Sequence, residues 1–308
     1  MIPGRKNRLT NSTATVIGLA VGLILRSFGP AFAQPLPKSA SQEFNTVLML
    51  STFQIVGSSF PLPHLCGLTG YSTGTGFVVS QPFVGPRQSE RNFVGSDGKV
   101  QRLVLVTAAH VLDGIGGDTA FLQARIKEGA EWKQLDLKLP IRNGGKSLYV
   151  KHPNKDVAVL DLLAVLNFSD LNFFKSNLVA IPMSYLAEEK FFDDNELHPG
   201  DDLSCLGFPL STHTTINSGA FPVLRGGKIA SYPILPQFLF DFEVFPGNSG
   251  GPVYISPQTR ATSHGLDLGG SYRIVGLLSA ELKNGQPLKM GVVVPSPFIL
   301  ETIQRLPM

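Results

Sequence analysis

Short apolar runs, separated by clusters of glycine, proline, asparagine and aspartate, recur along most of this sequence. Such runs, when they are bounded by turn-forming residues, are typical of β-strands. Few segments show the spacing of apolar residues that an amphipathic helix requires. We predict strands over residues 47–56, 75–80, 103–108, 120–127, 157–163, 222–232, 237–244, 274–280 and 290–294.

One segment near the C-terminus is the exception to this pattern. From Pro297 to Leu306 the apolar residues fall near one face of a helix, and Ser296 before them is a candidate N-cap. The 32 glycines and 23 prolines among the 308 residues imply many turns elsewhere. The pattern therefore predicts an all-β protein with a short C-terminal helix.

A single serine stands among glycines in the sequence Pro-Gly-Asn-Ser-Gly-Gly-Pro, residues 246–252. Serine is a weak nucleophile near neutral pH, so it needs an adjacent base and a preformed site for the charge that develops on an attacked carbonyl. Gly247 can adopt backbone conformations that side chains forbid, so its N–H can turn toward that charge. Ser249 is thus a candidate nucleophile, with the N–H groups of Gly247 and Ser249 as its oxyanion hole.

Two upstream segments offer a base and a group that orients it. His110 follows an apolar run and three small residues, and Asp156 leads a second apolar run over residues 157–160. A carboxylate at the edge of a core needs a hydrogen-bond donor, and the ring N–H of a histidine is suitable. Asp161 is a rival orienting residue, although it follows the apolar run instead of leading it.

Taken together, Thr107–His110, Asp156–Leu160 and Gly247–Pro252 resemble the motifs of the trypsin/chymotrypsin-like serine peptidases, particularly their bacterial secreted and HtrA-type branch. The order agrees with that family, and so do the gaps of 46 residues from histidine to aspartate and 93 from aspartate to serine. The C-terminal helix also fits the family. Because no long segment follows it, we expect a protease module without a PDZ domain.

The resemblance implies a chymotrypsin-like fold of two six-stranded antiparallel β-barrels with a short C-terminal helix. The first barrel would span residues 44–168 and carry His110 and Asp156, and the second would span residues 180–308 and carry Ser249. Ser249 would be the nucleophile and His110 the general base and then general acid. Asp156 would fix the tautomer of the His110 imidazole and stabilise the charged form of that ring. This chemistry uses no cofactor.

For substrate binding the resemblance indicates two further places. Glu243 would lie at the base of the primary pocket, where an acidic group favours lysine or arginine, and a solvent-facing Glu243 is the alternative. Ser279, Ala280 and Glu281 resemble the segment that binds an extended substrate strand. Digestive members of the family carry an aspartate before the serine to pair with a newly cut N-terminus. This chain has Asn248 there, so we expect no such activation switch.

The function that these motifs indicate is that of a secreted serine endopeptidase that acts on proteins or peptides, and other functions are open as alternatives. Gly247–Gly251 also matches the nucleophile elbow of α/β-hydrolases, but that fold needs an acid and then a histidine after the serine. No acidic residue lies between Ser249 and His264. A catalytically silent protease-fold binding protein or chaperone is the alternative from another class, and an esterase or transferase is the alternative on the same fold.

The N-terminus has the features of an export signal. Basic residues precede the apolar run 14–25, and Ala31-Phe32-Ala33 supplies small residues for cleavage, so residues 1–33 are predicted to be a signal peptide. We expect a secreted or periplasmic protein with no stable membrane partner after cleavage. An uncleaved N-terminal anchor is the alternative.

Cysteine, histidine and charge add little to these predictions. Cys66 and Cys205 would either form a disulfide between the barrels or stay as two buried thiols. The remaining histidines form no HExxH-like pair, so no metal site is predicted. A net charge of +3, without a basic stripe, does not indicate nucleic acid as a partner.

Overall fold

The structure is a computed structural model. It describes residues 44–58, 71–83, 93–94, 98–167, 170, 178–194, 197–211, 221–231, 233–256, 259–262, 265–268 and 272–307. These residues all belong to one compact unit of the chain, residues 34–308. The predicted signal peptide, Cys66 and most of the segment between the two expected barrels lie outside the described residues.

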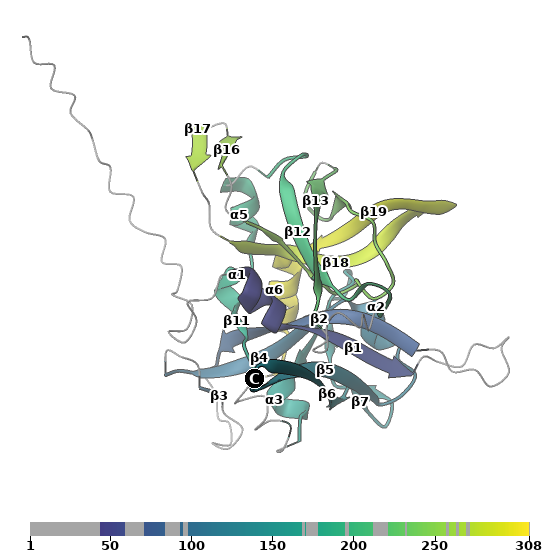
Figure 1. The fold of residues 1–308 in the computed structure, drawn as a ribbon. Coiled ribbons are helices and arrows are strands. Elements are labelled where there is room, and N and C mark those ends of the chain that lie inside the picture. The colour runs from purple at the N-terminus through teal and green to yellow at the C-terminus, as the bar shows by residue number, and fades with distance from the viewer. Residues whose placement is uncertain are drawn as a thin grey trace, which may run out of the picture. The chain divides into compact units, whose positions relative to one another are not determined.

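A first antiparallel sheet is built from strands in the N-terminal half of the described chain (Figure 1). Its nine strands are β1 (Thr52–Ser58), β2 (Tyr71–Pro82), β3 (Phe93–Val94), β4 (Val100–Thr107), β5 (Thr119–Glu128), β6 (Glu131–Pro140), β9 (Val150–Lys151), β10 (Ala158–Asp161) and β11 (Ile181–Pro182). The main path is β6-β5-β1-β2-β4-β10-β9, with β3 added to β4 and β11 parallel to β2. β4 is buried almost throughout, which explains its continuous apolar run.

A closed six-stranded barrel follows in the C-terminal half. Its strands are β12 (Asp202–Gly207), β13 (Val223–Ile229), β14 (Phe238–Asp241), β15 (Pro252–Ile255), β18 (Arg273–Asn284) and β19 (Gln286–Pro295). They pair in the order β12-β13-β14-β19-β18-β15. The predicted all-β class is therefore confirmed, and the second barrel has the expected six strands. The first sheet differs from the prediction in having nine strands.

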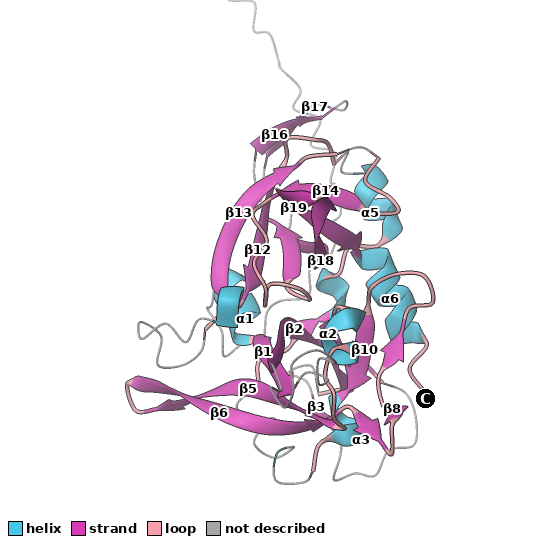
Figure 2. Ribbon diagram, turned by 90° about the vertical axis from the view of Figure 1, so that its right-hand side faces the viewer, coloured by secondary structure: helices cyan, strands magenta, loops and turns pink. Residues whose placement is uncertain are grey.

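The other elements are short (Figure 2). The helices are α1 (Phe44–Leu50), α2 (Ala109–Asp113), α3 (Leu162–Val165), α5 (Glu189–Asp194) and α6 (Ser296–Gln304), with 3₁₀ turns η2 (Met183–Tyr185) and η3 (Pro209–Ser211). Two small hairpins are β7 (Arg142–Asn143) with β8 (Lys146–Ser147), and β16 (Thr259–Thr262) with β17 (Gly265–Leu268). No helix in the described part of the chain is long and apolar enough to cross a membrane.

The N-terminal part of the first predicted strand is wrong, because residues 47–50 belong to helix α1. Phe44, Val47 and Leu48 are its buried residues, which is a helical spacing. The buried guanidinium of Arg125 donates to the carbonyls of Met49 and Leu50, at the end of that helix. Arg125, which is distant in the sequence, therefore supplies hydrogen-bond donors to carbonyls that have no partner within the helix. That contact is not visible in the local sequence.

The C-terminal helix is present, but its predicted cap is wrong. The Ser296 hydroxyl donates to the carbonyl of Ala187 at 2.6 Å instead of capping the helix. The buried residues Ile299, Thr302 and Ile303 confirm the expected apolar face. α6 contacts β9 and β10 of the first sheet as well as β18 and β19 of the barrel, so it does not pack on the second barrel alone.

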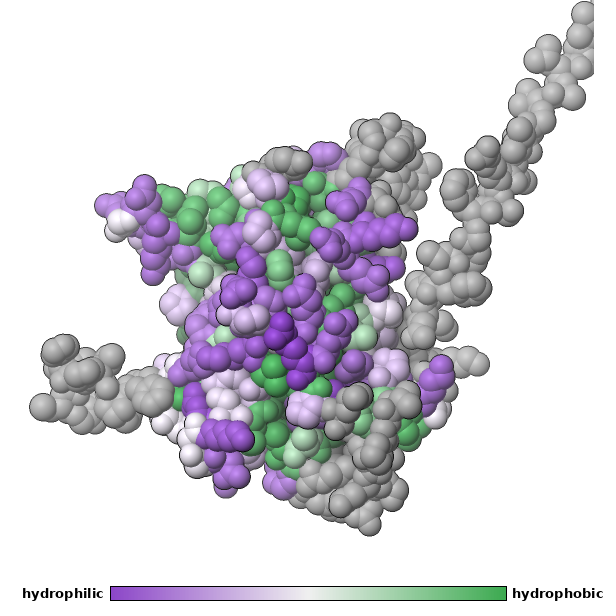
Figure 3. All heavy atoms as spheres, turned by 180° about the vertical axis from the view of Figure 1, so that it is seen from behind, coloured by the Kyte–Doolittle hydropathy of each residue, from purple (hydrophilic) through white to green (hydrophobic). Residues whose placement is uncertain are grey.

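The two sheets share one hydrophobic cluster. It joins residues such as Val106 and Leu160 of the first sheet to Leu206, Tyr254 and Leu277 of the barrel. On the surface, Figure 3 shows polar side chains across the middle of the face seen from behind, with apolar patches above and below. The shared core places the loops of the barrel against strands β2 and β4, where the candidate site lies.

Candidate active site

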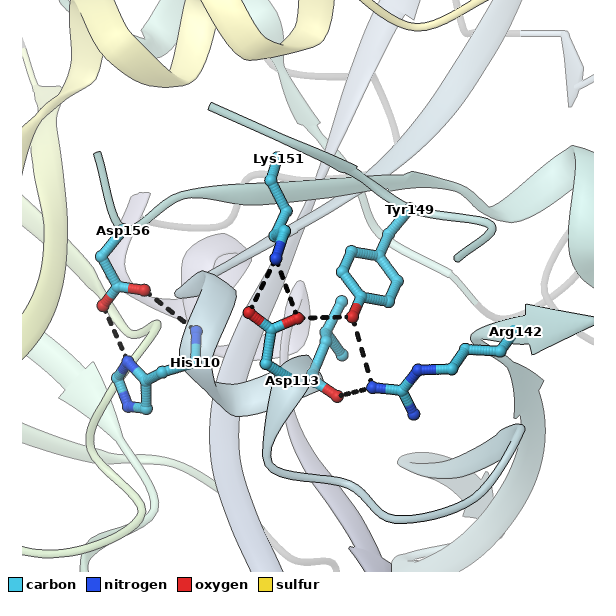
Figure 4. Close-up of polar contacts among 7 residues, drawn as sticks. His110, Asp113, Arg142, Tyr149, Lys151 and Asp156 are labelled. Atoms are coloured by element: carbon cyan, nitrogen blue, oxygen red, sulfur yellow. Dashed lines mark hydrogen bonds and ion pairs between the residues drawn. The ribbon is translucent and has the colours of Figure 1, made fainter. Parts of the chain in front are cut away.

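His110 and Asp156 are brought together by two short connections of the first sheet (Figure 4). β4 ends at Thr107, and α2 then presents His110 with half of its side chain exposed. Asp156 lies in the loop between β9 and β10. One carboxylate oxygen, Oδ2, lies 2.7 Å from Nδ1 of His110, and Oδ1 accepts the backbone N–H of His110 at 2.9 Å. A carboxylate only accepts, so the proton lies on Nδ1 and leaves Nε2 as the basic nitrogen.

Ser279 is the third group at the carboxylate. Its Oγ donates to Asp156 Oδ2 at 2.6 Å, from a β-bulge between Leu278 and Ala280 that turns this side chain out of the regular ladder. Burial raises the pKa of Asp156, but hydrogen bonds from His110 and Ser279 outweigh it, so the pKa falls below its ordinary value. The carboxylate is therefore charged near neutral pH.

Asp161, the rival orienting residue, lies elsewhere. Its carboxylate pairs with the buried guanidinium of Arg102 at 3.2 Å and accepts the N–H of Leu163 as the N-cap of α3. The structure thus assigns the two aspartates to different partners. Asp156 contacts the imidazole, and Asp161 supports a buried cation and a helix end.

The nucleophile loop, which we define as residues 245–251, has a regular pattern of backbone hydrogen bonds. Its carbonyls from Pro246 to Ser249 all accept a hydrogen bond, in chain order from Leu210 N–H, Thr75 Oγ1, Gly251 N–H and Thr75 N–H. The N–H groups of Asn248 and Gly250 donate to Phe245 and Leu278. Within the described residues, the N–H groups of Gly247 and Ser249 have no acceptor. These are the two donors that the sequence predicts for an oxyanion hole.

Gly247 and Gly250 are required by this loop. Gly247 has φ +96°, and a Cβ there would lie 2.2 Å from the carbonyl oxygen of Phe208. Gly250 has φ +86°, and a Cβ there would lie 2.1 Å from the Thr75 carbonyl oxygen and 3.0 Å from Ala108 N. The loop therefore packs directly against the strand end that leads into α2. Side chains at either position would push the two apart.

Ser249 lies between these glycines and is partly exposed. Among the described residues its hydroxyl makes no hydrogen bond to His110. Hydrogen bonds of this kind are often long or poorly aligned before a substrate binds. The structure thus brings together His110 and Asp156, and it places Ser249 on a loop that touches the backbone two residues before His110.

A network of polar side chains forms hydrogen bonds at the C-terminal end of α2, the helix that carries His110 (Figure 4). Asp113, the last residue of α2, accepts from Tyr149 OH at 2.7 Å and from Lys151 Nζ at 3.0 Å, and this hydrogen bond raises the pKa of Lys151. Arg142 donates to three carbonyls at and just beyond the helix end, those of Leu112, Ile115 and Gly117. Sequence reasoning missed this network, because its members come from separate elements.

His152 stabilises the loop that carries Asp156, a role that sequence reasoning also missed. Its Nδ1 accepts the N–H of Asn154 at 3.2 Å, so Nε2 carries the proton and donates to Glu301 Oε2 at 3.0 Å. Its backbone N–H donates to the carbonyl of Val157 at 3.0 Å, which closes the loop. Because Glu301 belongs to α6, the C-terminal helix is tied to the position of Asp156.

Of the candidate specificity residues, Ser279 contacts Asp156, and the other three have different surroundings. Glu243 is partly exposed and its Oε1 lies 3.3 Å from Nζ of Lys289, an exposed residue on β19 with φ +55°. The carbonyl of Glu243 accepts from Arg225 at 2.7 Å. Ala280 is exposed and Glu281 is partly buried. Lys289 was not predicted, since nothing in the sequence near it pointed to this pairing.

The described residues contain neither a candidate metal site nor a thiol that would react near neutral pH. No group of three histidine, cysteine, aspartate or glutamate side chains there is arranged to hold a metal ion. Cys205 is a free, buried thiol whose pKa burial raises to about 12. A thiol with so high a pKa is not reactive near neutral pH.

No family model matches the sequence, and no curated protein matches it. Among the solved structures that match is a serine endoprotease from Yersinia pestis, at 14% identity and TM-score 0.45, covering 87% of this chain and 67% of that chain. Another is the inactive form of the Rv3671c protease, at 17% identity and TM-score 0.43, covering 85% of this chain and 92% of that chain.

Proposed function

We propose that this protein is a serine endopeptidase, with Ser249 as the nucleophile, His110 as the base and Asp156 as the residue that orients the base. The observation that carries the proposal is the backbone pattern of the nucleophile loop. Among the described residues the N–H groups of Gly247 and Ser249 have no acceptor, and the N–H of Asn248 between them is bonded. The carboxylate of Asp156 is also hydrogen-bonded to Nδ1 of His110. Acyl transfer by a serine needs both features, a pair of donors for the oxyanion and an oriented base.

In the proposed reaction, Ser249 Oγ attacks the carbonyl carbon of a peptide bond and passes its proton to Nε2 of His110. The carbonyl oxygen becomes negative and accepts from the N–H groups of Gly247 and Ser249. His110 then protonates the leaving amine, and an acyl-enzyme forms on Ser249. Water attacks this ester by the same route. The charged Asp156 stabilises the imidazolium that exists in both steps.

The pairing of Glu243 bears on substrate choice. If Glu243 faces the primary pocket, Lys289 at 3.3 Å already supplies it with a cation. We therefore propose that a strong preference for lysine or arginine before the scissile bond requires Lys289 to move away. Profiling of a peptide library tests this point: Lys289→Ala should increase cleavage after basic residues, and Glu243→Ala should not. An unchanged profile in both variants would remove Glu243 from the pocket.

Hydrolysis of an unstructured protein tests the proposed activity directly. Casein should be cleaved by the wild-type protein and left intact by Ser249→Ala, with a parallel assay on an ester substrate. Ester hydrolysis without peptide cleavage would favour an esterase or transferase. Binding of casein without hydrolysis of either substrate would favour the silent binding protein or chaperone.

Export remains part of the proposal. The basic residues, apolar run and small residues of 1–33 support a secreted or periplasmic location, with an uncleaved anchor as the alternative. Sequencing the N-terminus of the protein isolated from its natural host separates the two. A start at Gln34 supports cleavage, and a start at the N-terminal methionine supports the anchor.

A further inference from the structure

A buried threonine of the first sheet holds the backbone around Ser249. Thr75 lies on β2, its residue is 0% exposed, and the sequence indicated nothing for it beyond a place in a strand. A hydroxyl that is buried this completely needs hydrogen-bond partners. Its partners belong to the barrel, not to the sheet in which Thr75 lies.

Both the hydroxyl and the backbone N–H of Thr75 bond to the nucleophile loop. Oγ1 donates to the carbonyl of Gly247 at 2.6 Å, and the backbone N–H donates to the carbonyl of Ser249 at 2.8 Å. One residue thus holds the carbonyls of Gly247 and Ser249. Their N–H groups are the two proposed oxyanion donors.

The backbone of Phe208 is the second partner of this hydroxyl. Its backbone N–H donates to Thr75 Oγ1 at 3.2 Å, while its carbonyl oxygen lies 2.2 Å from the position that a Cβ on Gly247 would take. The hydroxyl of Thr75 therefore links the backbone of Gly247 to the backbone of Phe208, the two segments that lie in close contact here. Without that hydroxyl, a buried C=O and a buried N–H would lose their partner together.

We infer that Thr75 is a positioning residue for the oxyanion hole. Its hydroxyl holds the peptide unit between Gly247 and Asn248, and with it the relative placement of the two donors on either side. This inference rests on the proposed function of Ser249. The contribution belongs to the step in which charge develops on the attacked group, and not to the binding of an uncharged ligand, because the donors matter most when that charge appears.

Thr52 supplies a matched control on β1, the strand next to β2. It is also 0% exposed, and its Oγ1 donates to the carbonyl of Leu48 at 2.7 Å. Thr52→Val therefore removes a buried hydroxyl and one buried hydrogen bond from the same sheet, and it leaves the hydrogen bonds of the nucleophile loop in place. A general loss of packing or hydrogen bonding would affect both valine variants alike.

The experiment measures the reaction of Ser249 with a fluorophosphonate at several probe concentrations. This separates the affinity of the initial complex from the rate constant of the covalent step. Thr75→Val should lower the rate constant about 10- to 100-fold and leave the affinity unchanged, since misplacing an oxyanion donor costs less than the roughly 10²–10³ of deleting one. Thr75→Ser keeps the hydroxyl and should restore most of the rate, and Thr52→Val should stay close to wild type.

The outcomes separate the inference from the proposed function. A wild-type protein that is folded but unlabelled refutes the proposed function and the inference with it. A labelled wild type with an equally fast Thr75→Val, or a Thr52→Val as slow as Thr75→Val, refutes only the inference. If Thr75→Val does not fold, Thr75→Ala and Thr75→Ser give the comparison, because they differ only in the hydroxyl.

Discussion

Replacing Asp156 with asparagine tests the role of the carboxylate with almost no change of shape. Oδ1 accepts the backbone N–H of His110, which cannot lose its proton, whereas Oδ2 accepts from Nδ1 of His110 and from Ser279 Oγ. An asparagine therefore places its carbonyl oxygen at the Oδ1 position and its NH₂ at the Oδ2 position. The opposite orientation would set two donors against each other, at a cost of about 1–3 kcal/mol.

In the favoured orientation the NH₂ group donates to Nδ1, so the proton moves to Nε2, and the nitrogen that is proposed to accept the proton of Ser249 is no longer basic. A cost of about 1–3 kcal/mol leaves the productive tautomer in roughly a sixth to less than a hundredth of the molecules. The charge that stabilises the imidazolium is lost as well. We expect kcat to fall by about 10⁴.

The assay is kcat on the best substrate from the peptide library, with the melting temperature as the measure of folding. Asp161→Asn is the control, because this aspartate supports the buried Arg102. Losing its charge should lower the free energy of unfolding by about 1–3 kcal/mol and leave kcat nearly unchanged. A folded Asp156→Asn that keeps more than about a tenth of wild-type kcat would refute the reasoning.

Four further predictions follow from the site and its supports. Gly247→Ala should lower kcat by about 10²–10³, because its Cβ would clash with Phe208, while Gly226→Ala, whose Cβ would meet only Leu203 O at 3.6 Å, should be mild; equal kinetics in the two variants would contradict this. Glu301→Ala should lower the free energy of unfolding by about 1 kcal/mol in a urea melt, and Glu301→Gln, which still accepts from His152, should lose less; a glutamine variant as unstable as the alanine one would count against the contact. Cys205 should resist iodoacetamide near pH 8 until the protein is unfolded, because its pKa is about 12; modification of the native protein, read by mass spectrometry, would show that the thiol is accessible. Since the folded pKa of Asp156 lies below its ordinary value of 3.8, its stabilising effect is present above that value and is lost as the pH falls through the folded pKa; Asp156→Asn should flatten the acid side of the stability curve, and an unchanged curve would argue against a charged carboxylate.

The parts of the fold with a strong local pattern could be predicted from the sequence. β4 and β5 follow runs of apolar residues, and the face of α6 follows a helical spacing. β6, with its alternating polar and apolar residues, was missed although it pairs along the whole of β5. The predicted strand 157–163 is too long at its end, because residues 162 and 163 belong to α3, which Asp161 caps.

The candidate site divides in the same way. His110, Asp156 and the glycines around Ser249 could be singled out because each stands in a short, distinctive context. Thr75 and its bond to Gly247 could not, since the two residues are 172 positions apart and a threonine in a strand is ordinary. Contacts of this kind depend on how the barrel loops meet the first sheet, and only the folded structure contains that information.

Labelling of Ser249 is the most direct test of the central claim. The purified protein would be treated with a fluorophosphonate probe and the modified residue identified by mass spectrometry, with Ser249→Ala and His110→Ala as controls. The account predicts stoichiometric modification at Ser249 that disappears in Ser249→Ala and slows strongly in His110→Ala. A folded protein that is not modified at Ser249, or one modified equally well without His110, would contradict it.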